Sequence, residues 1–231
     1  MPKILDLISK KIIEEYNKKE YEQNQKRVAN ERSVEYQFVF RCLSFCAPER
    51  ILDVGTGKTA LPALIDNCGY RVTAIDNIKD YWDEGYFNKH YHVINDDITN
   101  TKIVEKFDLI TCISVLEHVE DHEKALNSMV KLLKSNGYLI LTFPYNEKNF
   151  SPNIYEHPRA GYGQNAKYIC KVYSRKELEK WIKKFELEII SQEYWQIFNG
   201  EIWTEGGRLK EYRNVEGNDR HQLSCILLRR K

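Results

Sequence analysis

Two glycines and a carboxylate are spaced along this chain as a binding site for an adenosine-bearing ligand requires. The apolar run Ile51-Leu-Asp-Val leads directly into Gly55-Thr-Gly57, and the run Val72-Thr-Ala-Ile ends at Asp76. Such runs suit buried parallel strands, and the glycines let the backbone turn tightly and approach a ligand. Asp76 is placed to accept hydrogen bonds from ribose hydroxyls. We therefore interpret the segment as a nucleoside-cofactor site.

Other nucleotide sites use a similar turn. A phosphate-binding Walker loop needs a further glycine five positions before Gly57, where Leu52 stands instead, so this interpretation is rejected. The dinucleotide fingerprint is met in its relaxed form by Gly55-x-Gly57-x-x-Ala60, with Asp76 at the expected spacing. An NAD site therefore stays open as an alternative.

A site for S-adenosylmethionine accounts for more residues, since it also uses Asp53 before the glycines and Asp97 after the third apolar run. The whole pattern, over roughly residues 48–145, resembles the class I S-adenosylmethionine-dependent methyltransferases. In that family the glycine turn wraps the methionine part of the cofactor. The resemblance implies that Asp76 holds the ribose and that Asp97 reads the adenine amino group.

The resemblance also implies a fold and a set of cofactor contacts. The fold is α/β, with a doubly wound, mostly parallel seven-stranded sheet whose last strand is antiparallel, preceded by N-terminal helices. Residues 107–119 match the family's fourth strand and loop, and residues 137–144 match its fifth strand. The implied cofactor is S-adenosylmethionine, with S-adenosylhomocysteine as product. The residues expected to bind it are Asp53, Gly55, Gly57, Asp76, Asn77, Asp97, Ile98 and Ser114.

Methyl transfer to a hydroxyl benefits from a general base, which is typically worth about 10²- to 10⁴-fold in rate. Three residues are candidates for it. His118, with Glu117 behind it, follows the fourth strand and either acts as the base or only orders the loop. Tyr145 follows the fifth strand and is either an acid–base group or an aromatic wall. His157 lies four residues after Asn153 in a long connection and either binds an anionic acceptor with Arg159 or lies at the surface.

The elements that must position these residues fall into two parts. Residues 1–47 are expected to form helices that pack on the core, and residues 48–231 to form the methyltransferase domain. Two connections, residues 146–172 and 197–220, are much longer than usual. The first begins where the crevice rule for open parallel sheets places a ligand, so it is interpreted as an acceptor lid. The second either covers the same mouth or is a flexible loop.

Composition limits the partners. The 231 residues suit one substantial domain, and 35 lysine and arginine residues nearly balance 34 aspartate and glutamate residues. Nucleic acid is therefore not an expected partner, because the chain has no strong overall field to hold it. No apolar run approaches the about 18 residues of a membrane span, so membrane insertion is not expected. The oligomeric state is left open.

The chain has six cysteines and no C-x-x-C pair, which indicates reduced thiols and a cytoplasmic location. His90 and His92 flank Tyr91, but the spacing places no third ligand beside them, so no metal is expected. The frequent use of lysine, asparagine, isoleucine and tyrosine is typical of AT-rich bacterial sources.

The sequence thus predicts a methyltransferase that acts on a small polar metabolite. The balanced charge and the polar, aromatic insertions favour O-methylation of a sugar, a nucleotide-sugar or another cell-surface precursor. One alternative is an NAD-dependent oxidoreductase, although no lysine has a tyrosine four residues before it, as the short-chain class usually requires. A second alternative is a non-catalytic module that binds the cofactor and regulates a partner enzyme.

Overall fold

The computed structural model of the protein describes residues 2–24, 29–78 and 87–231. Contacts divide the chain into a short N-terminal unit that ends at Ser33 and a larger unit from Val34 to Lys231. The N-terminal unit contains α1 (Pro2–Asn24), the expected helix, whose apolar side chains, Ile4 and Ile8 among them, are exposed. The predicted packing on the core therefore stays a prediction for residues 1–33.

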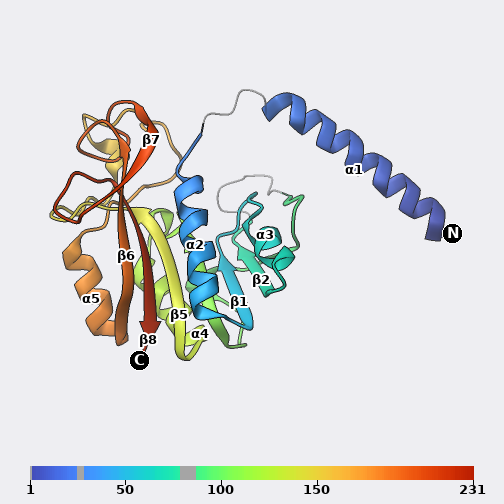
Figure 1. The fold of residues 1–231 in the computed structure, drawn as a ribbon, viewed down its shortest axis with the longest axis horizontal. Helices are drawn as coiled ribbons and strands as arrows, with labels where there is room; N and C mark the ends of the chain where they lie inside the picture. The colour runs from blue at the N-terminus through green and yellow to red at the C-terminus, as the bar shows by residue number, and fades with distance from the viewer. Residues whose placement is uncertain (1, 25–28, 79–86) are drawn as a thin grey trace. The chain divides into compact units, whose positions relative to one another are not determined.

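An eight-stranded sheet forms the larger unit, with the strand order β3-β2-β1-β4-β5-β8-β6-β7 (Figure 1). The first five strands in this order pair in parallel, β8 is antiparallel to β5 and β6, and β7 is antiparallel to β6. The doubly wound, mostly parallel fold is thus confirmed. The strands are β1 (Arg50–Val54), β2 (Arg71–Asp76), β3 (Val93–Asn95), β4 (Phe107–Ile113), β5 (Leu133–Pro144), β6 (Leu187–Phe198), β7 (Arg208–Val215) and β8 (Leu223–Arg230).

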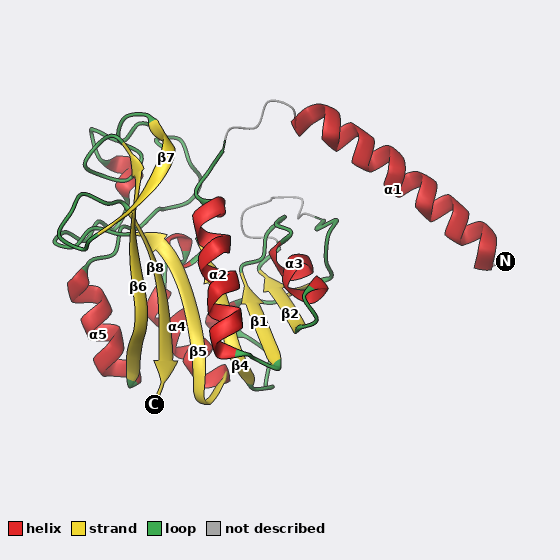
Figure 2. Cartoon of the chain, in the orientation of Figure 1, coloured by secondary structure: helices red, strands yellow, loops and turns green. Residues whose placement is uncertain are grey.

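Helices cover both faces of the sheet because alternate strand residues point to opposite sides (Figure 2). On one face, α2 (Arg32–Cys46) and α3 (Leu61–Asn67) pack against side chains such as Ile51 and Leu109. On the other face, α4 (His122–Leu132) and α5 (Arg175–Phe185) pack against side chains such as Leu52 and Ile110. Three short 3₁₀ helices lie in the connections: η1 (Ile98–Asn100), η2 (Leu116–His118) and η3 (Ile154–Glu156).

The eighth strand lies in the second long connection. The sequence predicts seven strands and leaves residues 197–220 as a cover or a flexible loop, whereas residues Arg208–Val215 form β7 at the edge of the sheet. Its register pairs Tyr194 with Val215 and Gln196 with Arg213. Much of this insertion is therefore built onto the sheet.

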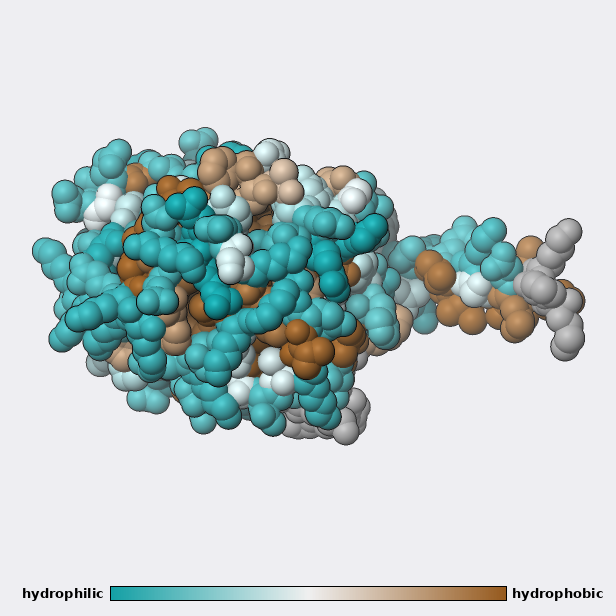
Figure 3. All heavy atoms as spheres, turned by 90° about the horizontal axis from the view of Figure 1, so that it is seen from below, coloured by the Kyte–Doolittle hydropathy of each residue, from teal (hydrophilic) through white to brown (hydrophobic). Residues whose placement is uncertain are grey.

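The face of the larger unit in Figure 3 is mainly hydrophilic, and its apolar side chains form small separate groups. Among the described residues, no helix combines the length and the apolar character that a bilayer crossing requires.

Candidate active site

The glycine turn follows β1 with both glycines at positive φ, +73° at Gly55 and +57° at Gly57. The N–H groups of Gly55 and Thr56 donate to the carbonyl of Ile75 on the neighbouring strand (2.9 and 3.3 Å). The two glycines differ in their surroundings. A Cβ on Gly55 would lie 2.4 Å from the Cγ atoms of Val115, whereas a Cβ on Gly57 would meet no atom of the described residues within 4 Å. Gly57 therefore borders open space, and Gly55 is packed against the loop after β4.

Asp53 stabilises this turn by accepting hydrogen bonds. It is buried, and its two carboxylate oxygens accept hydrogen bonds from the hydroxyls of Thr56 and Thr111, each at 2.6 Å. Thr111 lies on β4, so the carboxylate ties the turn to the central strands. A buried carboxylate is stable only with such partners. The structure thus places Asp53 behind the turn.

Asp76 and Asp97 follow β2 and β3, whose carboxyl ends meet at the same edge as the glycine turn. One oxygen of Asp76, Oδ2, accepts the N–H of Gly57 at 2.7 Å. Asp97 caps η1 and accepts the backbone N–H and the hydroxyl of Thr99 through Oδ1, both at 2.8 Å. Asn77 is half-buried beside Asp76, and Ile98 packs in the core. The predicted cofactor residues of the first three strands therefore line one edge of the sheet.

Ser114 lies directly after β4 in the left-handed region, with φ of +50°. Its N–H donates to the carbonyl and the hydroxyl oxygens of Thr142 on β5, both at 3.0 Å. Its hydroxyl donates to Oε1 of Glu35 at 2.5 Å, and the Thr142 hydroxyl donates to the same oxygen at 2.6 Å. Glu35 is fully buried on α2. This carboxylate therefore fixes the ends of β4 and β5 together.

His118 ends η2, and its ring is held in one orientation. Nδ1 lies 2.7 Å from the carbonyl oxygen of Ile169. A carbonyl only accepts hydrogen bonds, so Nδ1 carries the proton in the neutral ring and Nε2 is the basic nitrogen. Nε2 lies 3.8 Å from Oε1 of the buried Glu117, and Tyr168 packs edge-on against the ring. The carboxylate favours a positive charge on this ring by Coulomb attraction.

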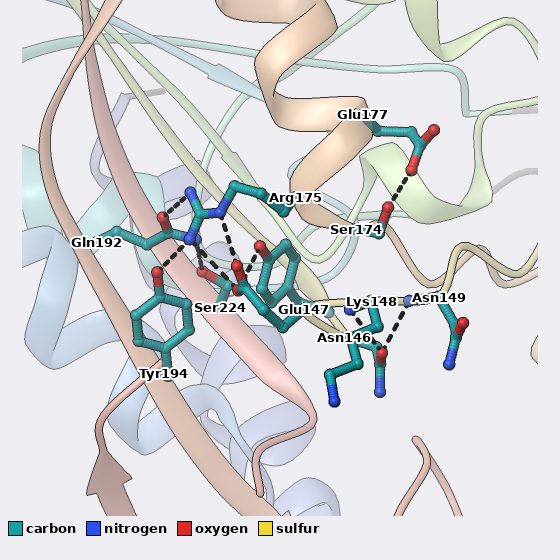
Figure 4. A network of polar contacts seen from close by, with 11 residues as sticks. Asn146, Glu147, Lys148, Asn149, Ser174, Arg175, Glu177, Gln192, Tyr194 and Ser224 are labelled. Atoms are coloured by element: carbon teal, nitrogen blue, oxygen red, sulfur yellow. Dashed lines mark hydrogen bonds and ion pairs between the residues drawn. The ribbon is translucent and has the colours of Figure 1, made fainter. Parts of the chain in front are cut away.

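Tyr145 is fully buried, and its hydroxyl donates to Oε2 of Glu147 at 2.9 Å. The Glu147 carboxylate also pairs with the Arg175 guanidinium at 2.9 Å (Figure 4). Burial and the neighbouring Glu147 raise the pKa of this hydroxyl well above its usual value. Burial alone would raise the pKa of Glu147, but hydrogen bonds from Arg175 and Tyr145 lower it on balance. Arg175 also donates to Gln192 and Tyr194 on β6. These contacts favour the aromatic-wall interpretation of Tyr145.

A cleft of about 330 Å³ opens between the two long insertions, and Tyr145 forms part of its wall. Residues 146–172 supply Phe150 and three small polar side chains, and residues 197–220 supply Trp203. The small polar side chains are Asn146, Asn149 and Ser151. The cleft thus combines aromatic surface with groups that form hydrogen bonds.

His157 and Arg159 line the same cleft. The backbone N–H of Arg159 donates to Nδ1 of His157 at 3.1 Å, so the neutral ring carries its proton on Nε2. The Arg159 guanidinium pairs with Glu205 at 3.0 Å, and the cleft carboxylate of Glu201 pairs with Arg220 at 3.3 Å. The charges in the cleft wall are therefore balanced by neighbours.

The two insertions interlock. The N–H of Gly161 donates to the carbonyl and the hydroxyl oxygens of Thr204, at 3.1 and 3.2 Å. A Cβ on Gly161 would lie 2.4 Å from that carbonyl oxygen, so only glycine allows this approach. Trp203 packs edge-on against Phe198 with ring centroids 5.1 Å apart. The two insertions therefore contact each other and line the same cleft, and their role as covers of the ligand site stays a prediction.

Residues 168–173 connect the cleft to His118. Ile169 holds the His118 ring, Val172 lines the cleft, and the Tyr173 hydroxyl donates to the carbonyl of Leu116 at 2.8 Å. Ile169 and Val172 are three residues apart, a separation of at most about 10 Å in an extended chain. His118 itself is not among the residues that line the cleft.

The structure also brings in residues that sequence reasoning did not identify, chiefly Glu35 and the pair Glu147 and Arg175. Glu35 had a recognisable signal, since it shares a helical stripe with Phe38, Val39 and Cys42. Across the described residues, histidine, cysteine, aspartate and glutamate side chains form no cluster that could hold a metal ion.

Comparison with known proteins places the chain in a family. A family profile described as a methyltransferase domain matches residues 17–192. A ubiquinone biosynthesis O-methyltransferase from Pseudomonas fluorescens is 27% identical over 150 residues, which cover 61% of this chain and 61% of that protein. The chain spans roughly half the length of the curated relatives that it matches.

Two solved structures share the fold. A methyltransferase from Thermotoga maritima has a TM-score of 0.58 and 18% identity, covering 95% of this chain and 99% of its own. The 1,6-didemethyltoxoflavin-N1-methyltransferase of Burkholderia thailandensis, solved with S-adenosylhomocysteine, has a TM-score of 0.57 and 13% identity, covering 84% and 77%. The family match decides against an NAD-dependent oxidoreductase. The chain belongs to the methyltransferase-domain family.

Proposed function

We propose that the protein transfers a methyl group from S-adenosylmethionine to a hydroxyl of a small polar metabolite bound in the cleft between the two insertions. His118 is the general base in this proposal. The observation that carries it is the hydrogen bond from His118 Nδ1 to Ile169, which makes Nε2 the basic nitrogen. The sequence-based guess of a sugar, a nucleotide-sugar or another cell-surface precursor is kept as the acceptor class.

The residues at the sheet edge fit the cofactor. Gly57 borders open space at a backbone conformation that L side chains rarely adopt, which suits close approach of a ligand to the main chain. Carboxylates at Asp76 and Asp97 offer acceptors for ribose hydroxyls and for an exocyclic amine. Asn77, Ile98 and Ser114 would complete the contacts, and Asp53 would act through the turn. The cofactor supplies a methyl carbon on a positively charged sulfur.

His118 would take the proton of the acceptor hydroxyl at Nε2, which converts a weak nucleophile into a better one. The ring would then be positively charged, and Glu117 at 3.8 Å would stabilise that charge. His157, with its proton on Nε2, would donate a hydrogen bond to the acceptor. Tyr145 would form an aromatic wall, because its hydroxyl already donates to Glu147.

The cleft supports a small, polar acceptor, and within the proposed class it favours a neutral sugar over a nucleotide-sugar, whose diphosphate is anionic. Aromatic faces can stack on a ring, and amide and hydroxyl side chains can bind its polar groups. Arg159 and Glu201 both have oppositely charged neighbours, so neither supplies an uncompensated charge for an ionic acceptor. The similarity to an O-methyltransferase of Pseudomonas fluorescens also favours oxygen as the methylated atom.

The net charge and the cysteines bear on the partners and the location of the protein. The net charge of +1 gives little attraction for nucleic acid. None of the six cysteines, all of which the structure describes, takes part in a disulfide, which supports a location in the reducing cytoplasm.

Calorimetric titration with S-adenosylhomocysteine tests the cofactor part. Asp76→Ala should weaken binding by about 1.5–3 kcal/mol, the scale for losing a hydrogen bond to a charged group. Asp219→Ala, which removes an exposed carboxylate at the β7–β8 turn, is the matched control and should bind as the wild type does. Equal affinity of the Asp76 variant and the wild type would remove Asp76 from the site.

A turnover panel tests the acceptor part. Formation of S-adenosylhomocysteine should be stimulated by neutral sugars or nucleotide-sugars, and the product should carry an O-methyl group in mass spectra. Stimulation only by amines would overturn oxygen as the methylated atom. Stimulation only by catechols would keep the reaction and overturn the sugar class.

A further inference from the structure

Asn88 contacts the glycine turn through its side-chain amide. Nδ2 donates to the carbonyl oxygens of Gly57 and Thr59, at 2.8 and 3.0 Å. Oδ1 accepts the backbone N–H groups of His90 and Tyr91, at 2.8 and 3.1 Å. The residue is 6% exposed. An asparagine amide has two N–H groups and one oxygen with two lone pairs, so these four bonds use its whole capacity.

The turn is therefore held at Gly57 from two directions. Asp76 accepts the N–H of Gly57 at 2.7 Å, and Asn88 donates to its carbonyl at 2.8 Å. These contacts fix both peptide groups that flank a residue at φ of +57°. Within the part of the chain that the structure describes, a Cβ on Gly57 would meet no atom within 4 Å, so these two contacts leave one side of the residue open to that part.

The oxygen of the Asn88 amide is also held in place by hydrogen bonds. Oδ1 closes a local turn with His90 and Tyr91, and the Tyr91 hydroxyl donates to the carbonyl of Val72 at 2.9 Å. Val72 lies on β2, the strand that ends at Asp76. The donor that holds the Gly57 carbonyl is thus connected to the same strand as the acceptor that holds the Gly57 N–H.

We infer that Asn88 is a positioning residue for the cofactor, which acts by fixing the carbonyls of Gly57 and Thr59 so that the turn keeps the conformation that receives S-adenosylmethionine. This inference rests on the proposed cofactor role of the turn. Asn88 is placed behind the turn by its hydrogen bonds and is not assigned a contact with the reacting atoms.

Aspartate is the most informative replacement, because it has the shape of asparagine and lacks the two N–H groups. In Asn88→Asp a carboxylate oxygen would face two carbonyl oxygens, which is unfavourable in a buried place. When the introduced carboxyl is protonated, it again offers one hydrogen-bond donor, its O–H group. The defect should therefore be relieved at acid pH, a signature that loss of packing alone would not produce.

The test is calorimetric titration of the full-length wild type, Asn88→Asp, Asn88→Ala and Asn67→Asp with S-adenosylhomocysteine at pH 8 and pH 5. Asn67 is exposed at the end of α3 and controls for the added charge. Thermal unfolding of each variant accompanies the titrations. At pH 8, Asn88→Asp should bind about tenfold or more weakly than the wild type, and Asn67→Asp should bind normally.

At pH 5 the ratio of wild-type to Asn88→Asp affinity should shrink, while the ratio for Asn88→Ala should stay constant. Binding of Asn88→Asp within about twofold of the wild type at pH 8 would overturn the inference. If Asn88→Asp does not fold, Asn88→Ala decides, and unchanged affinity in that variant overturns the inference. Failure of the wild type to bind S-adenosylhomocysteine would instead overturn the proposed function of the turn itself.

Discussion

The loop after β4 and the first insertion each carry a histidine, and the two rings are hydrogen-bonded in opposite senses. His118 donates from Nδ1 to the carbonyl of Ile169, whereas His157 accepts the N–H of Arg159 at Nδ1. The neutral rings therefore expose different atoms: a basic Nε2 at His118 and an Nε2–H donor at His157. Only the arrangement at His118 suits a general base. In the proposed mechanism, the backbone contacts therefore give His118 and His157 different roles.

Replacement of each histidine by alanine should produce the largest difference between these two regions. His118→Ala should lower the methyl-transfer rate by about two orders of magnitude or more, because no other group takes the acceptor proton. The rate of the wild type should fall at acid pH, because a protonated ring accepts no proton. This fall of the rate on the acid side should be absent in His118→Ala. His157→Ala should mainly raise the acceptor KM.

Steady-state kinetics against acceptor concentration and pH provide the measurement, and S-adenosylhomocysteine affinity is the control for both variants. Similar rate losses in the two variants, or a retained acid limb in His118→Ala, would contradict the division of roles between the rings.

The two glycines of the turn offer a second comparison, between a packed and an open position. Gly55→Ala should destabilise the fold by about 2–4 kcal/mol, since its Cβ would lie 2.4 Å from Val115 at positive φ. Gly57→Ala should cost only the backbone strain, about 1–2 kcal/mol, because its Cβ meets no atom of residues 2–24, 29–78 and 87–231 within 4 Å. Urea unfolding gives both values. Equal losses of unfolding free energy in the two variants would mean that the Val115 side chain moves aside at little cost.

A smaller effect is expected when the free energy of unfolding is measured as a function of pH. Burial lowers the pKa of His122 and of His221. A lowered pKa means that the unfolded chain binds protons more readily, so stability should fall as pH drops below about 6.5, the unfolded value. Urea unfolding at pH 7.5 and pH 5.5 should show this loss, and His122→Phe should reduce it. Identical pH dependence in that variant would exclude His122 as a cause.

The arrangement of the glycine turn beside Asp76 could be predicted because its determinants are local in sequence, while the binding of a cofactor there stays a prediction. Strand, glycine turn and following acid recur in order, and the register of β1 with β2 brings Gly57 and Asp76 together once the strands pair in parallel. The role of Asp53 was not predictable in the same way. Its position before the glycines indicated a cofactor contact, but its partner Thr111 lies 58 residues away on β4.

The acceptor half could not be predicted in detail because its contacts are long-range. The tautomer of His118 depends on the carbonyl of Ile169, 51 residues later. The cleft depends on the approach of Gly161 to Thr204, and nothing in either insertion alone indicates this pairing. The eighth strand was missed because β7, with the sequence RLKEYRNV, is mostly polar, lacks a period-2 alternation of apolar residues and lies at a sheet edge inside an apparent connection.

Long-range proton–nitrogen NMR correlations of ¹⁵N-labelled protein at pH 8 test the central claim most directly, because they identify the protonated nitrogen of each neutral imidazole without any acceptor. His118→Ala and His157→Ala assign the signals. The hydrogen bonds predict a proton on Nδ1 of His118 and on Nε2 of His157. A proton on Nε2 of His118 would leave that ring without a basic nitrogen at this position and would contradict its role as the base.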